Sequence, residues 1–157
     1  LQYVIINRGS DDGVLSGMPV VSAEGLVGHV AAVTSNAARV QLITDPASLA
    51  SVKIQPSDAD AVLQGTITSN LLLDLIPQDS TIQPGDLVLT SGLGGLYPAN
   101  IIVGQLTSVR QQATNLFKEA SVQPVVDFSR MRIILVIVNF NPVDITPLIP
   151  EEDSAQP

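Results

Sequence analysis

The sequence predicts an all-β fold, with two small β-barrels related by an internal repeat and almost no helix. Hydrophobic residues make up 45% of the 157 residues and aromatic ones only 3%, so Val, Ile and Leu must fill the core. Turn-forming residues recur at short intervals between β-branched runs, as in proteins made of many short strands. The best helix candidate, Asp45–Leu49, is long enough for only about one turn.

Eleven segments have strand character, and several show the alternation of a half-buried strand, for example Val40 with Leu42 and Val52 with Ile54. Turn residues such as Glu24-Gly25 and Ser35-Asn36 separate neighbouring segments. In chain order, the predicted strands are Tyr3–Ile6, Pro19–Ser22, Leu26–Thr34, Arg39–Thr44, Ser51–Gln55, Ala61–Thr68, Leu71–Ile76, Asp86–Thr90, Ile101–Val109, Lys118–Val126 and Arg132–Asn139.

An internal repeat organises these strands. The segment GMPVVS at 17–22 resembles GDLVLT at 85–90, and VGHV at 27–30 resembles VGQL at 103–106. Each copy ends in an aliphatic run followed by an aspartate, Asp45 in the first and Asp127 in the second. The sequence therefore contains two related β units.

The repeat alone does not decide how the strands are divided between the two units. A closed barrel needs about five or six strands, because fewer strands leave open edges. We therefore favour a discontinuous first barrel, 1–16 with 80–140, around an inserted second barrel, 17–79. A sequential split into 1–77 and 78–140 is the alternative. The proline-rich, acidic segment 141–157 is expected to be disordered.

The overall composition argues against several classes of function. The net charge is −8 and the seven Lys and Arg residues are scattered, which disfavours nucleic acids and anionic membranes as partners. The absence of cysteine excludes disulfides and thiolate sites. No apolar run approaches the roughly 18 residues that span a bilayer, and the chain begins at Leu1 within a strand, so we expect a fragment of a longer protein.

The loop TSGLGGLYPAN at 90–100 is the first candidate for a nucleotide-binding or catalytic site. Its glycines, Gly92, Gly94 and Gly95, are followed by Pro98 and a strand, whereas a dinucleotide or P-loop fingerprint must open a helix. We interpret the loop as the longer form of the SAEG turn at 22–25. No cofactor is predicted.

A serine protease is the main enzymatic alternative, because His29, Asp45 and Ser91 occur in the chain order of a trypsin-like triad. His29, however, lies in the middle of a strand, and the equivalent repeat position is Gln105. A carbohydrate-binding β module is a further alternative, disfavoured because aromatic residues are scarce.

Acidic residues do not predict a metal or glycosidase site. Asp58 with Asp60 and the run 151–153 lack the spacing of a calcium loop. Asp74 has no identifiable carboxylate partner for glycoside hydrolysis. The sequence therefore predicts no metal site and no enzymatic activity.

Two apolar runs, Leu71–Ile76 and Ile133–Val138, exceed strict alternation. Such a run is typical of a strand buried on both faces. It could alternatively provide an exposed patch or a pairing edge for a partner or for self-association.

Four stretches together resemble the extracytoplasmic domain of the bacterial rod shape-determining protein MreC family. They are INRGSDDGVLSGMPVVSAEGLVGHV, ARVQLITDP, PGDLVLTSGLGGLYPANIIVGQLTSV and VVDFSRM. The family-signature positions, interpreted as structural turns, are Gly25, Gly28, Asp45, Gly85, Asp86, Ser91, Gly92, Gly94, Gly95, Pro98, Gly104 and Asp127.

The resemblance implies a non-catalytic scaffold of the cell-elongation machinery that maintains rod shape. Family members lie in the periplasm, anchored in the inner membrane through a helix and a coiled coil. They bind and position or activate a class B penicillin-binding protein and associate with MreD, MreB and RodA-type proteins. They also form homodimers or higher assemblies. The residues that contact these partners are not predicted.

Overall fold

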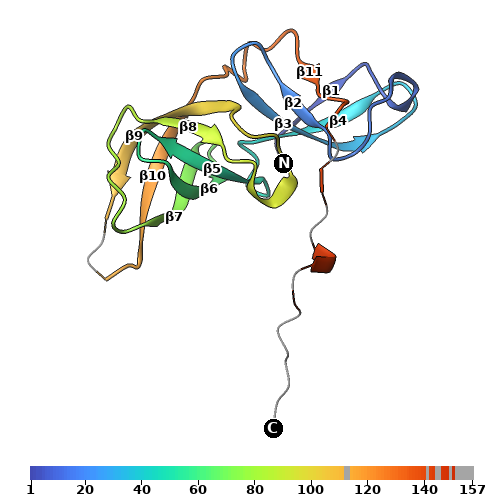
Figure 1. Ribbon diagram of the computed structural model, residues 1–157. Helices are drawn as coiled ribbons and strands as arrows, with labels where there is room; N and C mark the ends of the chain where they lie inside the picture. Colours follow the sequence, from blue (N-terminus) through green and yellow to red (C-terminus); the bar gives the residue numbers. More distant parts are fainter. Residues whose placement is uncertain (112–113, 141, 144–145, 149, 151–157) are drawn as a thin grey trace.

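The protein consists of two β units that lie side by side (Figure 1). The computed structural model describes residues 1–111, 114–140, 142–143, 146–148 and 150. The predicted all-β class is confirmed: described helical turns are three short 3-10 segments, η1 (Ser10–Asp12), η2 (Leu93–Gly95) and η3 (Thr146–Leu148). The predicted disordered tail, 141–157, lies largely outside the described residues.

The first unit is a curled sheet of five antiparallel strands in the order β1-β4-β3-β2-β11. Its buried side is aliphatic and includes Val20, Val27, Val30 and Val40, each of which is fully buried. The strands are β1 (Tyr3–Ile6), β2 (Pro19–Val21), β3 (Leu26–Val33), β4 (Ala38–Leu42) and β11 (Leu135–Val136).

The second unit is a closed six-stranded barrel in the order β10-β7-β6-β5-β8-β9, with every neighbouring pair antiparallel. Alternate residues point inward, as in β5, where Ala50, Val52 and Ile54 are buried. The strands are β5 (Leu49–Gln55), β6 (Ala59–Gly65), β7 (Leu71–Pro77), β8 (Leu87–Thr90), β9 (Ile102–Arg110) and β10 (Phe117–Pro124).

The strands are grouped differently from the predicted division. The barrel holds the strands between 49 and 124, and the sheet holds those between 3 and 42 together with β11. Neither 1–16 with 80–140 around 17–79, nor a break near 77, matches this grouping. The difference arises from pairing between distant segments: β1 pairs with β4, and β7 pairs with β10. The local sequence pattern that predicts a strand does not specify which other strand it pairs with.

The sequence repeat corresponds to a structural repeat. Strands β2-β3-β4 and β8-β9-β10 are consecutive neighbours in their sheets. Gly17 and Gly85 have φ of 92° and 94°. Their N–H groups donate to Val30 and Leu106, each at 2.7 Å. The two copies therefore form the same three-stranded element in two different surroundings.

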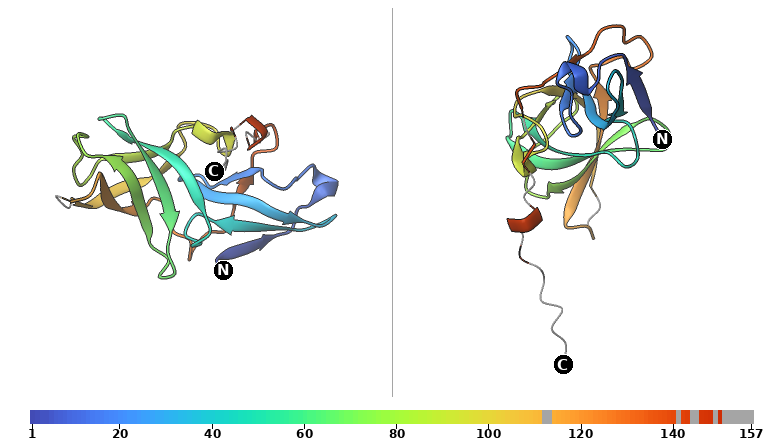
Figure 2. Two further views of the ribbon diagram at one scale, coloured as in Figure 1. Left: turned by 90° about the horizontal axis from the view of Figure 1, so that it is seen from below. Right: turned by 90° about the vertical axis from the view of Figure 1, so that its right-hand side faces the viewer.

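The two units are packed against each other. Leu26 and Ile43, from the sheet and the link that follows it, belong to the core of the barrel, and Phe128 contacts both cores. The views in Figure 2 agree, with the units side by side from below and one behind the other from the end.

Candidate functional site

The predicted protease triad is not assembled. His29 Nδ1 lies 3.2 Å from the hydroxyl of Tyr97. Asp45 accepts hydrogen bonds from the backbone of Gln2 and Ala47 and from the amide of Gln41. Ser91 Oγ accepts a hydrogen bond from Leu93 N at 3.2 Å. Among the described residues, no hydrogen bond joins any two triad members, so the geometry gives no basis for nucleophilic catalysis.

The glycine loop is a compact turn that carries a buried tyrosine. Gly92, Gly94 and Gly95 have φ between 71° and 79°, a region that favours glycine. Thr90 closes the loop by donating to Pro98 O at 2.6 Å and accepting from Ile101 N at 2.9 Å. Tyr97 is thereby placed against His29 of the other unit, their rings edge to face at 6.3 Å.

Two of the predicted signature aspartates occupy equivalent turns in the two units. Asp45 accepts from Ala47 N at 2.8 Å, and Asp127 accepts from Ser129 N at 3.1 Å. The pKa of Asp45 is lowered, chiefly by the hydrogen bond from the backbone of Gln2. The pKa of Asp127 is lowered by hydrogen bonds from the side chain and backbone of Ser129 and by nearby Arg130.

Signature glycines allow close approach of neighbouring strands. A Cβ on Gly28 would lie 1.8 Å from Gln41 O, and one on Gly104 would lie 2.1 Å from Gln123 O. A Cβ on Gly25 would likewise lie 2.3 Å from Ile102 O of the other unit. Asp86 accepts from Gln83 N at 2.9 Å and so holds the turn before β8.

Acidic residues do not gather into a metal site. Within the described ranges, no group of three or more His, Cys, Asp or Glu side chains is placed to hold a metal ion. In the same ranges, no helix is long and apolar enough to cross a membrane.

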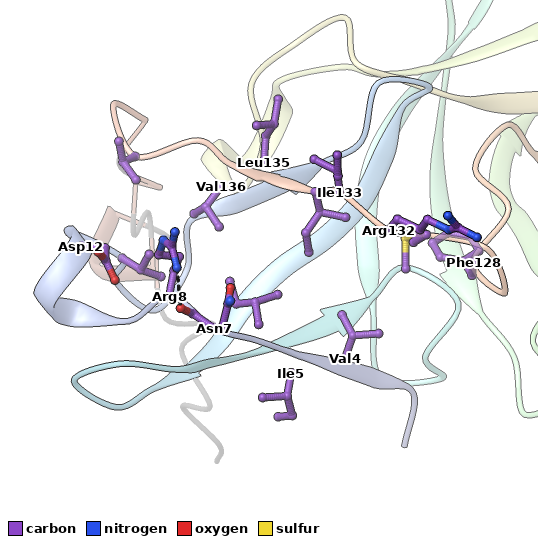
Figure 3. A pocket seen from close by; sticks show the side chains of 15 residues that line it. Val4, Ile5, Asn7, Arg8, Asp12, Phe128, Arg132, Ile133, Leu135 and Val136 are labelled. Carbon is purple, nitrogen blue, oxygen red and sulfur yellow. Dashed lines mark hydrogen bonds between the residues drawn. The ribbon is translucent and has the colours of Figure 1, made fainter.

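The larger hollow of the first unit is a groove between the edge strands β1 and β11 (Figure 3). Its volume is about 690 Å³. Side chains of Val4, Ile6, Ile134 and Val136 pack toward the aliphatic core, while Arg8 and Arg132 also line the groove. Of the two predicted apolar runs, 133–138 therefore forms one side of an open groove, with Ile133 80% exposed.

The other apolar run, Leu71–Ile76, divides between core and surface. Leu71, Leu73 and Ile76 are buried in the barrel. Leu75 is 48% exposed, because β7 changes register with β10 at this point. Beside the neighbouring Asp74, Leu116 of the β9–β10 connection is 82% exposed and Phe117, the first residue of β10, is 41% exposed, so this part of the barrel carries an apolar surface.

Sequence reasoning did not find the groove or this barrel surface. Both depend on which strands lie at an edge and where register shifts, and these are results of long-range pairing. The only signal was the surplus of apolar residues in the two runs.

Residues 1–138 match the family described as "Rod shape-determining protein MreC, barrel core". The chain belongs to the MreC family. Cell shape-determining protein MreC of Haemophilus influenzae is 32% identical over 154 residues, covering 96% of this chain and 44% of that protein. MreC of Escherichia coli is 32% identical over 150 residues, covering 95% and 41%. The chain thus spans less than half the length of these relatives.

Solved MreC structures have the same fold. The crystal structure of MreC from Pseudomonas aeruginosa is 31% identical with a TM-score of 0.81, covering 86% of this chain and 88% of that one. The major periplasmic domain of the cell shape-determining filament MreC is 29% identical with a TM-score of 0.70, covering 80% and 79%. A complex of penicillin-binding protein PBP2 with MreC from Helicobacter pylori, at 22% identity and TM-score 0.64, covers 75% and 74% and shows the fold alone.

The family assignment confirms the expected resemblance and the non-enzymatic class. MreC is a cell-shape scaffold family and not a known enzyme family. The trypsin-like hydrolase is therefore rejected, in agreement with the hydrogen bonds of His29, Asp45 and Ser91, each of which goes to a residue outside the triad.

Proposed function

We propose that this chain is the extracytoplasmic part of a membrane-anchored scaffold of the cell-elongation machinery. Membership of the MreC family is the observation that carries the proposal. The periplasmic position of a structural neighbour, 29% identical, supports the location. The anchor in the inner membrane is inferred from the family resemblance.

The proposed partner is a class B penicillin-binding protein, which the scaffold positions or holds in its active arrangement. The Helicobacter pylori neighbour is a complex of MreC with PBP2, and this supports the same class of partner here. A scaffold activates an enzyme by binding its active state more tightly, and about 1.4 kcal/mol of preference shifts that equilibrium tenfold.

This apolar part of the barrel suits such a contact. Aromatic residues are enriched at the energetic centres of interfaces, and Phe117 is one of only five Phe and Tyr residues in the sequence. With Leu116 it lines an exposed hollow that Asp74 and Glu119 also line. Burial of these two apolar side chains would provide affinity without any catalytic group.

Titration of the full extracytoplasmic region with the periplasmic domain of the cognate transpeptidase tests the proposal. We expect saturable binding that Phe117→Ser weakens by about 1–3 kcal/mol, the range for truncation of a contributing interface residue. Ile67→Ser is the matched control, since Ile67 is exposed in the connection between β6 and β7, away from Phe117 in sequence and strand pairing. Failure of the unsubstituted region to bind the transpeptidase would reject the proposed function.

Self-association and contacts with MreD, MreB and RodA-type proteins complete the proposed assembly. They rest on the family resemblance, and sedimentation and co-purification of the full protein test them. The proposed assembly would be contradicted if the full protein sediments as a monomer and no MreD, MreB or RodA-type protein co-purifies with it.

A further inference from the structure

A hollow of about 290 Å³ lies where the two units meet. His29 and Val30 of the sheet form one side of it, and Leu49, Leu96 and Tyr97 of the barrel form the other. None of the described residues that line the hollow is acidic, lysine or arginine, in a chain with 15 acidic residues. Leu49 and Leu96 stay partly open to solvent, so the hollow is an accessible, uncharged and largely apolar site.

The segment that follows β11 reaches this hollow and contacts both units. Pro142 lines the hollow, and its ring lies against Gly17 of the sheet unit, where a Cβ would be 3.4 Å from Pro142 Cγ. The N–H of Val143 donates a hydrogen bond to the carbonyl of Gly95, in the glycine loop of the barrel, at 3.0 Å. The protein therefore shows what kind of segment the hollow accepts, namely a proline followed by an aliphatic residue whose N–H pairs with the loop.

Two glycines make room for this segment. Gly95 has φ of 71°, and a Cβ there would lie 3.1 Å from Val143 Cβ and 3.2 Å from Val143 O. Gly17 has φ of 92°, and the position of its absent Cβ faces the Pro142 ring. A larger residue at either position would be strained, and at Gly95 it would also press on the segment. The room for the segment is thus provided by both units.

Proline and the residue after it suit this site for different reasons. Proline has no N–H, so it enters an apolar hollow without leaving a backbone donor unpaired. Its fixed φ lowers the entropy lost on binding, and proline segments therefore commonly dock on aromatic-lined grooves. The rings of Tyr97 and His29 line this hollow, and Val143 supplies the backbone hydrogen bond.

The chain's own segment holds the site weakly. A backbone hydrogen bond joins Val143 to the glycine loop, but the side chain of Val143 is exposed. Segments that bury little apolar area open at low cost in free energy. The volume of about 290 Å³ is left with Pro142 in place, so the hollow is larger than its present occupant.

We propose that this hollow is an exchangeable binding site for an extended segment of a partner protein in which a proline precedes an aliphatic residue. The partner segment takes the place of Pro142–Val143, and its neighbouring apolar side chains fill the volume beside Leu49 and Leu96. The chain's own segment thereby acts as an internal competitor that lowers the apparent affinity for the partner. The proposal goes beyond the transpeptidase contact, which involves Leu116 and Phe117 instead.

A released variant and a peptide test the exchange. Pro142→Asp together with Val143→Pro places a charge in the uncharged hollow and removes the N–H that donates to Gly95. In two-dimensional amide NMR spectra of the full extracytoplasmic region, the signals of Gly17, His29 and Gly95 should move in this variant. Addition of the peptide NFNPVDITP, the sequence of residues 139–147, should return them saturably toward their positions in the unsubstituted protein.

The unsubstituted protein should bind this peptide about tenfold more weakly than the released variant, since a site that is free in one molecule in ten binds tenfold more weakly. The peptide NFNAVDITP, without the first proline, should not restore the signals. No saturable return, equal affinity of the two proteins, or equal binding of NFNAVDITP would overturn the proposal. Signals of the unsubstituted protein that change with its own concentration would assign the site to a second copy and would also overturn it.

Leu96→Ser and Leu93→Ser locate the bound peptide. Both leucines belong to the glycine loop and are similarly exposed, 53% and 59%, but of the two only Leu96 lines the hollow. In the released variant, Leu96→Ser should weaken NFNPVDITP about threefold to tenfold, and Leu93→Ser should leave its affinity unchanged. Equal effects would place the peptide elsewhere and contradict the proposal. Thermal melting verifies that each variant folds, and transpeptidase binding is measured separately, so either proposal can fail alone.

Discussion

At the scale of single residues, glycine sets how closely the strands approach. Gly28 lies on β3, where a Cβ would overlap Gln41 O of β4 at 1.8 Å. The overlapping atom is backbone, so the strands would have to move apart. The equivalent Gly104 meets Gln123 O in the same way, which indicates that the requirement belongs to the repeated element.

Gly28→Ala should therefore lower the free energy of unfolding by about 2–3 kcal/mol, the range for a forced overlap in a packed region. Urea denaturation measures it. Gly13→Asn is the comparison: Gly13 has φ of 81° with open space around it, and Asn tolerates that conformation, so the loss should stay below about 1 kcal/mol. Equal losses at the two sites would disprove close approach as the cause.

Asp45 makes stability depend on pH. Its pKa is lowered in the folded state, first by the backbone hydrogen bond from Gln2, so the unfolded chain binds the proton more tightly. The stabilisation is complete above the ordinary pKa of 3.8 and is lost as pH falls through the lower folded value. Asp127, shifted in the same direction, adds to the effect.

Asp45→Asn should reduce stability by about 1–3 kcal/mol at pH 7, because a charge-assisted acceptor is removed from a buried turn. The difference from the unsubstituted protein should shrink below pH 4. Urea denaturation between pH 3 and 7 measures this difference, with substitution of the exposed Asp58 (Asp58→Asn) as control. A difference that is constant with pH would show that the carboxylate charge is not the cause.

At the scale of elements, β7 contains an irregularity with an energetic cost. Leu75 has φ of 58°, a left-handed conformation that costs a non-glycine residue about 1–2 kcal/mol. The register between β7 and β10 shifts here, and Leu75 N donates to the Asp74 side chain at 2.7 Å. The bulge turns Leu75 outward, away from the core that Leu73 and Ile76 fill.

Leu75→Asn should stabilise the barrel by about 0.5–1 kcal/mol, since Asn adopts this conformation more easily and little apolar burial is lost. Thermal unfolding measures it. The adjacent core substitution Leu73→Asn should be strongly destabilising, because it buries an amide in an aliphatic core. Destabilisation by Leu75→Asn would show that the exposed side chain contributes more than the backbone strain.

The elements themselves were largely predictable from sequence, and their partners were not. All eleven predicted strands occur, because period-2 alternation and turn residues are local properties. The prediction was least accurate near the end of the chain: Arg132–Asn139 was predicted as a strand, and the strand observed there is only Leu135–Val136. The bulge at Leu75 depends on pairing across the sheet, which leaves no local pattern.

The residues of the candidate site were predictable to the same extent: equivalent positions within the repeat were found from sequence, and contacts between the units were not. The repeat marked Gly28, Gly104, Asp45 and Asp127 as equivalent positions, and the structure places them at equivalent contacts. Nothing in the sequence indicated that His29 would meet Tyr97, since the two come from different units. Contacts between units are specified by shape and not by periodicity.

At the scale of the whole molecule, the His29–Tyr97 contact links the two units beside a cavity of about 290 Å³. Burial lowers the pKa of His29, and burial raises the pKa of Tyr97. A neutral His29 is therefore favoured in the folded protein. The contribution of neutral His29 to the stability of the folded protein is complete above the ordinary pKa of 6.5. This contribution declines as the pH falls from 6.5 toward the lower pKa that His29 has in the folded protein.

Tyr97→Phe should lower the free energy of unfolding by about 0.5–1.5 kcal/mol at pH 7.5, the value of one hydrogen bond. A double-mutant cycle with His29→Gln measures the coupling, and the exposed Tyr3→Phe is the control. Additive effects of Tyr97→Phe and His29→Gln would show that the contact does not couple the units.

The insertion of the barrel within the sheet also determines how the molecule responds to mechanical force. The chain leaves the sheet after β4 and returns to it at β11, with the whole barrel between. Tension applied between Tyr3 and Val136 is therefore carried across the β1-β4-β3-β2-β11 ladder, while the closed barrel lies outside the load path. Under such tension the strand pairs of the sheet must separate before any load reaches the barrel through the chain.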